Sequence, residues 1–231
     1  MKGRARTYRA THVAQAVMAL AAALASGCAA VAPRLPVPLP EHAVAVGAFG
    51  AGGGGVNGTA TYQAPYVVGL AGGSVQWQAI RVGDVAVEVD AALGGGLTPV
   101  FGTVVPLFGA LVGARGWYLK RDFALGVDGC LSGMIGQMEA QQSFQGGGTA
   151  TVTFVQPELR ALGAVRIADQ LWFGTRPGLI VVVPANPWNL TPAVDVPLAL
   201  VWDASQLRFG LEGGWVVPYG GRGGASVSWV F

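Results

Sequence analysis

Short polar turns flanked by alternating apolar segments recur along most of the chain. Each turn contains an Asp, a residue that can hydrogen-bond to the backbone of its own turn. The flanking segments alternate with a period of two residues, which is typical of strands with two unlike faces. The four turns are Arg81–Asp84, Lys120–Asp122, Ala168–Gln170 and Asp203–Gln206. The pattern predicts antiparallel hairpins and an all-β fold.

Ten segments fit this strand pattern, and their connections alternate between short turns and longer stretches rich in Gly or Pro. The stretch 59–73 could extend two of these strands or hold a further pair, so eight or twelve strands are alternatives to ten. An even strand number with short connections on one side and long ones on the other is typical of a transmembrane β-barrel. The expected strands are 42–52, 74–80, 84–95, 107–119, 122–133, 155–167, 170–180, 193–202, 206–216 and 223–231.

The scarcity of charge argues for a membrane location. Only 11% of the 231 residues are charged, against about 25% in ordinary domains, and the mean hydropathy is +0.49. Outside the N-terminal leader, no apolar run reaches the roughly 18 residues of a membrane-spanning helix. We therefore expect an antiparallel transmembrane β-barrel whose apolar surface is spread over its strands.

The N-terminus has the organisation of a secretory signal, with four basic residues up to Arg9 and an apolar stretch over 13–24. Small residues then precede Cys28, which resembles a bacterial lipoprotein signal. The family prefers Leu three residues before the Cys, where this chain has Ala25. The resemblance implies a signal peptide over 1–27 and acylation of Cys28, with ordinary cleavage nearby as the alternative. Residues 28–41 are then expected to form a Pro-rich tether to a barrel over 42–231.

The last segment, Gly223–Phe231, places Val227, Trp229 and Phe231 on one strand face and ends in Phe. It resembles the closing strand of bacterial outer-membrane β-barrels. This resemblance implies contact with outer-membrane lipid and insertion by the barrel-assembly machinery. Ala29 and Ala30 lack the Asp that commonly retains lipoproteins in the inner membrane, which also favours the outer membrane.

The charged strand faces are too sparse in charge to form a good water-facing surface, so we expect them to point inward as a paired network. If they pointed outward, the chain would be a periplasmic, lipid-tethered barrel that binds a small lipophile. The orientation of Leu207, Phe209, Leu211 and Trp215 decides between the two. The expected network is Glu88, Asp90, Arg115, Asp128, Glu158, Arg160, Arg166, Arg176, Asp195, Arg208 and Glu212.

Aromatic residues cluster within about five residues of the short turns or of the C-terminus, as in the interfacial girdle of a membrane barrel. The expected girdle is Trp77, Trp117, Trp172, Trp202, Trp229 and Phe231.

The sequence gives little support for a catalytic or cofactor-binding site. The histidines are His12, in the leader, and His42, at the entry to the first strand, and no Cys/His cluster suggests a metal. Glu88 and Asp90 are best interpreted as counter-ions of lumenal Arg residues. Gly50–Gly55 matches a nucleotide-binding pattern without a following helix, and we expect a flexible outer loop there. We expect no enzyme, cofactor or metal.

The mature chain contains 10 basic and 12 acidic residues, because four of the 14 Lys and Arg residues lie in the leader. A net charge of −2 gives no support for nucleic-acid binding. A barrel of about ten strands has a lumen that is blocked or very narrow. We expect an outer-membrane barrel with a structural role or a narrow passage; a surface barrel for adhesion or partner binding is a further alternative.

Overall fold

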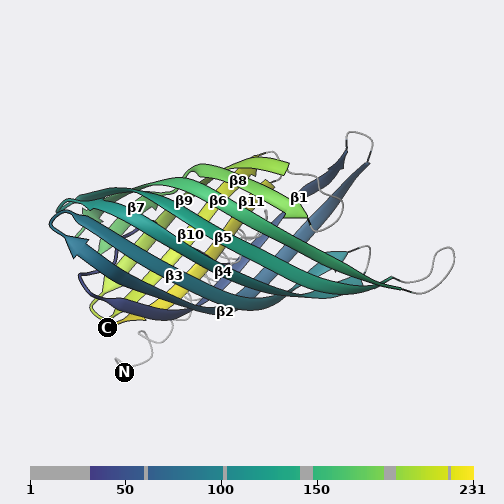
Figure 1. Ribbon diagram of the computed structural model, residues 1–231, viewed down its shortest axis with the longest axis horizontal. Helices are drawn as coiled ribbons and strands as arrows, with labels where there is room; N and C mark the ends of the chain where they lie inside the picture. The colour runs from purple at the N-terminus through teal and green to yellow at the C-terminus, as the bar shows by residue number, and fades with distance from the viewer. Residues whose placement is uncertain (1–31, 60–61, 101–102, 141–147, 185–190, 218–219) are drawn as a thin grey trace, which may run out of the picture.

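The computed structural model describes residues 32–59, 62–100, 103–140, 148–184, 191–217 and 220–231, and from Val44 onward these form one antiparallel sheet wound into a barrel (Figure 1). Its strands are β1 (Val44–Thr59), β2 (Tyr62–Val82), β3 (Val85–Val100), β4 (Thr103–Leu119), β5 (Phe123–Ala140), β6 (Gly148–Ala168), β7 (Leu171–Thr175), β8 (Gly178–Pro184), β9 (Thr191–Ala204), β10 (Leu207–Val217) and β11 (Gly220–Val230).

The barrel has ten strands around its circumference, because β7 and β8 are two halves of one strand. Both halves lie between β6 and β9 and keep the same register against each neighbour. Pro177 interrupts them, since it has no N–H to donate to the ladder. The sheet closes where β11 pairs with both β10 and β1, and Phe231 N–H donates to the Val44 carbonyl at 2.9 Å. The all-β prediction of about ten strands is confirmed.

The four Asp-containing turns join consecutive strands at one end of the barrel, called here the short-turn rim. At this rim the predicted strand ends lie within two residues of the observed ones. Gly83 and Ser205 adopt positive φ angles of 58° and 60°, which allow the chain to reverse within two residues. The turn chemistry therefore locates the hairpins from sequence alone.

At the opposite end of the barrel, several strands, among them β1, β2, β5 and β6, extend much further than predicted. β2 and β6 each contain 21 residues, about twice the 9–11 that a membrane-spanning strand needs. In Figure 1, β5 and β6 reach well beyond the neighbouring strands at this end, called here the long-connection end. The glycine run Gly50–Gly55 lies within β1 and pairs with β2 and β11. The expectation that this run forms a flexible outer loop is therefore wrong.

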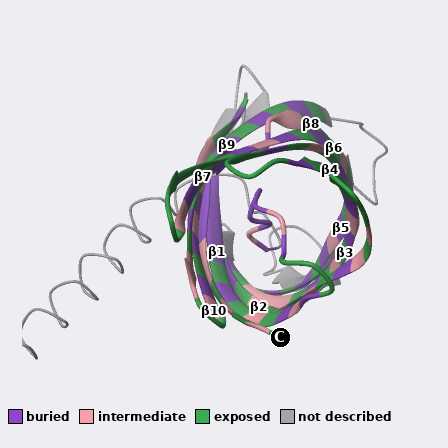
Figure 2. Cartoon of the chain, turned by 90° about the vertical axis from the view of Figure 1, so that its left-hand side faces the viewer, coloured by how far each residue is buried: buried purple, intermediate pink, exposed green. Residues whose placement is uncertain are grey.

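The apolar strand faces point outward and the charged faces point inward. Phe209 is 38% and Trp215 is 64% exposed on the outer surface, whereas Glu88 is fully buried and Arg160 is 3% exposed. Figure 2 shows buried and exposed residues alternating along the strands. The lipophile-binding barrel required Glu88, Arg160, Arg208 and Glu212 on the outside, and all four are buried. The described residues include no helix that is long and apolar enough to cross a membrane.

Residues 32–41, called here the lumenal segment, enter the interior of the barrel (Figure 2). Arg34, Leu35, Val37 and Leu39 are each at most 7% exposed. The prediction of a tether outside the folded domain is therefore wrong for these residues. The remainder of that range, with Cys28 and the expected signal peptide, lies outside the described residues.

Candidate functional site in the barrel lumen

The lumenal segment crosses the interior without a ladder partner among the described strands. Four of its ten residues are prolines, which have no N–H group to leave unsatisfied inside a protein. Proline also favours an extended backbone. The composition that suggested a linker therefore also suits a buried, extended chain that pairs with no strand.

Arginine side chains of the barrel replace a neighbouring strand as hydrogen-bond donors. Arg115 Nη1, from β4, donates to the Leu35 carbonyl at 2.8 Å. Arg208, from β10, donates to the carbonyls of Val37 at 3.3 Å and Pro38 at 3.0 Å. These contacts involve backbone atoms, so they recognise an extended chain more than particular side chains.

Near the short-turn rim, the backbone of the segment is held by a carboxylate and an amide. The Leu39 N–H donates to Glu88 Oε1 at 2.6 Å, and Gln78 Nε2 donates to the Leu39 carbonyl at 3.0 Å. The His42 N–H donates to Gln78 Oε1 at 3.0 Å, while Gln76 donates to the second oxygen of Glu88 at 2.7 Å. Glu88, expected as a counter-ion, therefore acts here as an acceptor for the backbone of the segment.

Arg34 links the lumenal segment to the strands by ion pairs inside the barrel. Among the described residues, no other side chain of the segment forms an ion pair there. Arg34 Nε and Nη2 donate to the two oxygens of Asp90 at 2.7 and 2.5 Å. Its Nη1 lies 2.6 and 2.8 Å from the oxygens of Asp128. Asp90 also lies 3.7 Å from Arg115. A guanidinium with two carboxylates matches its planar donors to fixed acceptors.

Glycines on the inner surface leave the space that the segment fills. A Cβ at any of four glycine positions would approach an atom of the segment more closely than van der Waals contact allows. The pairs are Gly224 with Pro33, Gly113 with Arg34, Gly210 with Leu35 and Gly174 with Pro36. The small inward residues therefore accommodate part of the chain itself.

The apolar side chains of the segment join three apolar clusters of the interior. Leu35 and Val37 pack in a cluster that includes Trp117 and Trp172, and Leu39 joins a smaller one nearer the rim. Ala32 packs in a cluster with Phe49 and other residues further inside. Burying a Leu or Val side chain stabilises by roughly 1.5–3 kcal/mol, so these contacts favour the seated segment.

Beyond Arg34, ion pairs continue across the lumen. Arg176 donates to both oxygens of Glu212 at 2.9 and 3.0 Å. Arg222 donates to both oxygens of Asp195 at 2.5 and 3.0 Å and to Glu212 at 2.6 Å. Arg160 also pairs with Asp195. Each of these charges is thus held by more than one opposite charge.

Together these residues form one continuous network in which acids and bases alternate. Its ends are Glu158, which accepts from Arg160 at 2.8 Å, and Arg115. The Arg176–Asp128 link is the longest, at 3.9 Å. In order, the network consists of Glu158, Arg160, Asp195, Arg222, Glu212, Arg176, Asp128, Arg34, Asp90 and Arg115. Equal numbers of acids and bases make the layer electrically neutral.

No protein-family model matches the sequence, and no curated protein matches it. The fold is similar to the translocator domain of the autotransporter NalP from Neisseria meningitidis, with a TM-score of 0.55, 9% identity, and coverage of 83% of this chain and 88% of that one. It is also similar to an outer-membrane channel from Pseudomonas putida F1, with a TM-score of 0.56, 8% identity, and coverage of 87% and 100%. The chain has the fold of a bacterial outer-membrane β-barrel.

Four of the six expected girdle residues point outward on this outer-membrane barrel fold. Trp77, Trp202, Trp229 and Phe231 are 45–72% exposed near the short-turn rim. The ring of Trp202 stacks on Phe209 with centroids 5.5 Å apart. These positions suit the amphipathic boundary between apolar lipid and water.

Two girdle predictions are wrong, because Trp117 and Trp172 point into the barrel and are 2% and 7% exposed. Trp117 is two residues from inward-facing Arg115 on the same strand, so strand alternation places both on the inner face. Arg166 shares the inward face with Trp172, its direct partner in the ladder, as the lumenal prediction requires. It is nevertheless exposed at the short-turn rim, where its guanidinium lies 4.7 Å from the centre of the Trp172 ring.

The basic residues at the short-turn rim are separate from the lumenal network. Lys120 Nζ donates to Asp84 of the neighbouring turn, and this hydrogen bond raises the pKa of Lys120 above its ordinary value. In the lumen, Arg208 pairs with Asp203 at 2.6 Å rather than with the network. Its expected role as a lumenal charge is nevertheless consistent with its burial.

Sequence reasoning missed Arg34 and Arg222. Arg34 was assigned to the tether, and Arg222 lies at the edge of a stretch expected to be a connection. Their positive charge was a usable signal, because the expected network had six acids and only five bases. Cys130 is a buried free thiol on the inner face. No group of metal-binding side chains occurs among the described residues.

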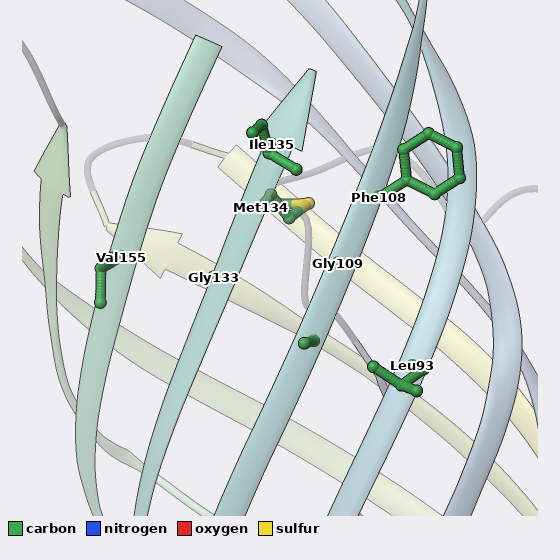
Figure 3. Close-up of a pocket in the computed structure, with 8 residues that line it drawn as sticks. Leu93, Phe108, Gly109, Gly133, Met134, Ile135 and Val155 are labelled. Carbon is green, nitrogen blue, oxygen red and sulfur yellow. The ribbon is translucent and has the colours of Figure 1, made fainter.

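The outer surface has a shallow apolar groove of about 350 Å³ across β3 to β6 (Figure 3). It is lined by small residues such as Ala110 and Gly133 and by larger side chains such as Leu93, Phe108 and Ile135. None of its lining residues is charged. It belongs to the apolar outer face and is separate from the polar lumen.

Proposed function

We propose that the chain is an outer-membrane β-barrel lipoprotein that forms a narrow passage, and that its lumenal segment holds this passage closed. The observation that carries the proposal is Arg34, which belongs to the lumenal segment and forms part of the ion-pair network across the lumen. Strand residues cannot leave the lumen, but a segment joined to β1 at one end can. The fold shared with an outer-membrane channel supports a passage.

Conductance in planar bilayers tests this function. The full chain should show little conductance, and a variant lacking residues 29–40 should show discrete steps. A heat-dependent gel shift establishes that both proteins are folded barrels. If the folded variant is also silent, the passage is wrong and a structural role takes its place. Metabolic labelling with palmitate, with Cys28→Ser as the control, tests the lipid separately.

A further inference from the structure

The lumenal segment is held like a bound peptide. It is covalently continuous with the barrel only through residues 42–43, at the short-turn rim. Its other contacts are hydrogen bonds, ion pairs and packing contacts of the kind that hold peptide ligands. The wall contributes donors to its carbonyls from Arg115, Arg208 and Gln78, and small residues that fit its outline.

We propose that the lumen is a binding site for an extended, proline-rich peptide with one arginine, and that the lumenal segment is its built-in ligand. The proposal deepens the proposed function, on which it rests, by naming what the emptied passage binds. A second peptide of this class then enters only when the lumenal segment has left.

The chemistry of the site defines the class of peptide. Asp90 and Asp128 form an acidic pocket for one guanidinium. The next residue, Leu35, lies against Gly210 and within an apolar cluster with Trp117. A lysine would place only a point charge where Arg34 uses donors from three nitrogens, so arginine is the preferred residue.

Prolines are the second feature of this peptide class, because they favour an extended backbone and carry no N–H group. Pro36 is buried against Gly174, and an extended proline-rich chain loses little conformational freedom on binding. The only segment N–H with a wall acceptor in the described contacts is that of Leu39, which donates to Glu88. A peptide with many free N–H groups would leave donors unsatisfied in this interior.

The covalent link explains why the segment occupies its own site. Attachment through a short linker gives an effective concentration on the order of millimolar. A free peptide therefore competes poorly with the attached segment in the intact chain. Cutting the link removes this advantage and leaves the barrel unchanged.

Glu41 and His42 are exposed at the rim, so the link can be cut in the folded protein. The test uses the chain from residue 29, which carries no lipid, with a protease site inserted between these two residues. After cleavage, a fluorescent synthetic peptide with the sequence of residues 32–41 is titrated into the detergent-solubilised barrel. The labelled peptide should replace the cut fragment and bind saturably.

Matched peptides make the result specific. The same peptide with Arg34→Glu should bind at least tenfold more weakly, and a scrambled peptide should not saturate. The uncut barrel should bind none of them measurably. Equal binding of the scrambled peptide, or no saturable binding to a cut barrel that retains its heat-dependent gel shift, overturns the proposal.

Conductance of the same cut barrel separates this proposal from the passage itself. Peptide binding without conductance, even after the fragment is washed out, leaves the binding site standing and overturns the passage. Conductance without saturable peptide binding leaves the passage standing and overturns the binding site. Conductance that the matching peptide blocks, and the scrambled peptide does not, supports both.

Discussion

Arg34 and Asp90, which are 56 residues apart in sequence, are joined by two hydrogen bonds of 2.5 and 2.7 Å inside the barrel. This pair fixes the lumenal segment to β3. It also makes the segment part of the neutral network that crosses the lumen. The stability of the barrel and the closure of its lumen therefore depend on the same contact.

Arg34→Ala should destabilise the barrel and loosen the segment. It removes the nearest base of Asp90 and Asp128, and breaking a buried ion pair on one side costs about 3–5 kcal/mol. The free energy of unfolding in lipid vesicles, measured with urea, should fall by this order. Arg121→Ala, at an exposed turn position, is the matched control. An equal loss of unfolding free energy in both variants would contradict the buried ion pairs of Arg34.

Gly174→Ala should displace the segment without changing any charge. A Cβ at this position would lie 2.8 Å from Pro36 Cγ and 3.0 Å from the Pro36 carbonyl oxygen. Overpacking of this kind costs about 1–3 kcal/mol. Protease cleavage at the rim should become faster, and conductance should rise. At Gly129 a Cβ would meet nothing within 4 Å, so Gly129→Ala should behave like the unchanged protein.

Arg222→Ala should destabilise the part of the network that lies beyond Arg176 from the segment. Asp195 and Glu212 each keep one further base, Arg160 and Arg176. The loss in unfolding free energy should thus be about 3 kcal/mol, at the lower end for a broken buried pair. Urea unfolding measures it, with Arg81→Ala at the rim as the control. No loss beyond that control would show that Arg222 is dispensable.

Strand alternation and turn chemistry were sufficient to predict the fold, because each hairpin carries its own local signal. The same alternation also exposes an inconsistency in the sequence predictions. Arg115 and Trp117 are two residues apart on one strand, so they share a face and cannot be lumenal and lipid-facing respectively. Inward-facing Arg115 settles the orientation of Trp117 without any structure.

The lumenal segment could not be predicted in the same way. Its prolines are equally suited to a solvated linker and to a buried extended chain, and the sequence does not say which environment it meets. The signal lay elsewhere, in inward-facing glycines such as Gly113, Gly174 and Gly210. Empty space inside a narrow barrel must be filled. Only the three-dimensional structure shows that the lumenal segment fills it.

Trp117→Ala should be much more destabilising than Trp77→Ala. Trp117 packs inside the barrel against the cluster that holds Leu35 and Val37, and emptying such a site costs about 3–5 kcal/mol. Trp77 is 48% exposed on the outer face, so lipid can fill the space that it leaves. Unfolding free energies of the two variants should differ by at least about 1 kcal/mol. A larger loss for Trp77→Ala would contradict the inward orientation of Trp117.

The direction of the lumenal segment predicts the side on which the preceding residues emerge. Three successive inward positions of β3 mark its path, starting from the short-turn rim. Glu88 contacts Leu39, Asp90 contacts Arg34, and Ala92 lies in the cluster of Ala32. The chain therefore runs toward the long-connection end as it is followed back toward its N-terminus. In outer-membrane barrels the short turns are periplasmic.

An epitope inserted after position 30 should accordingly be accessible to antibody on intact cells. The same epitope in the turn after Ala204 should become accessible only after the outer membrane is permeabilised. If the N-terminal epitope also requires permeabilisation, the seated segment does not lead to the cell surface.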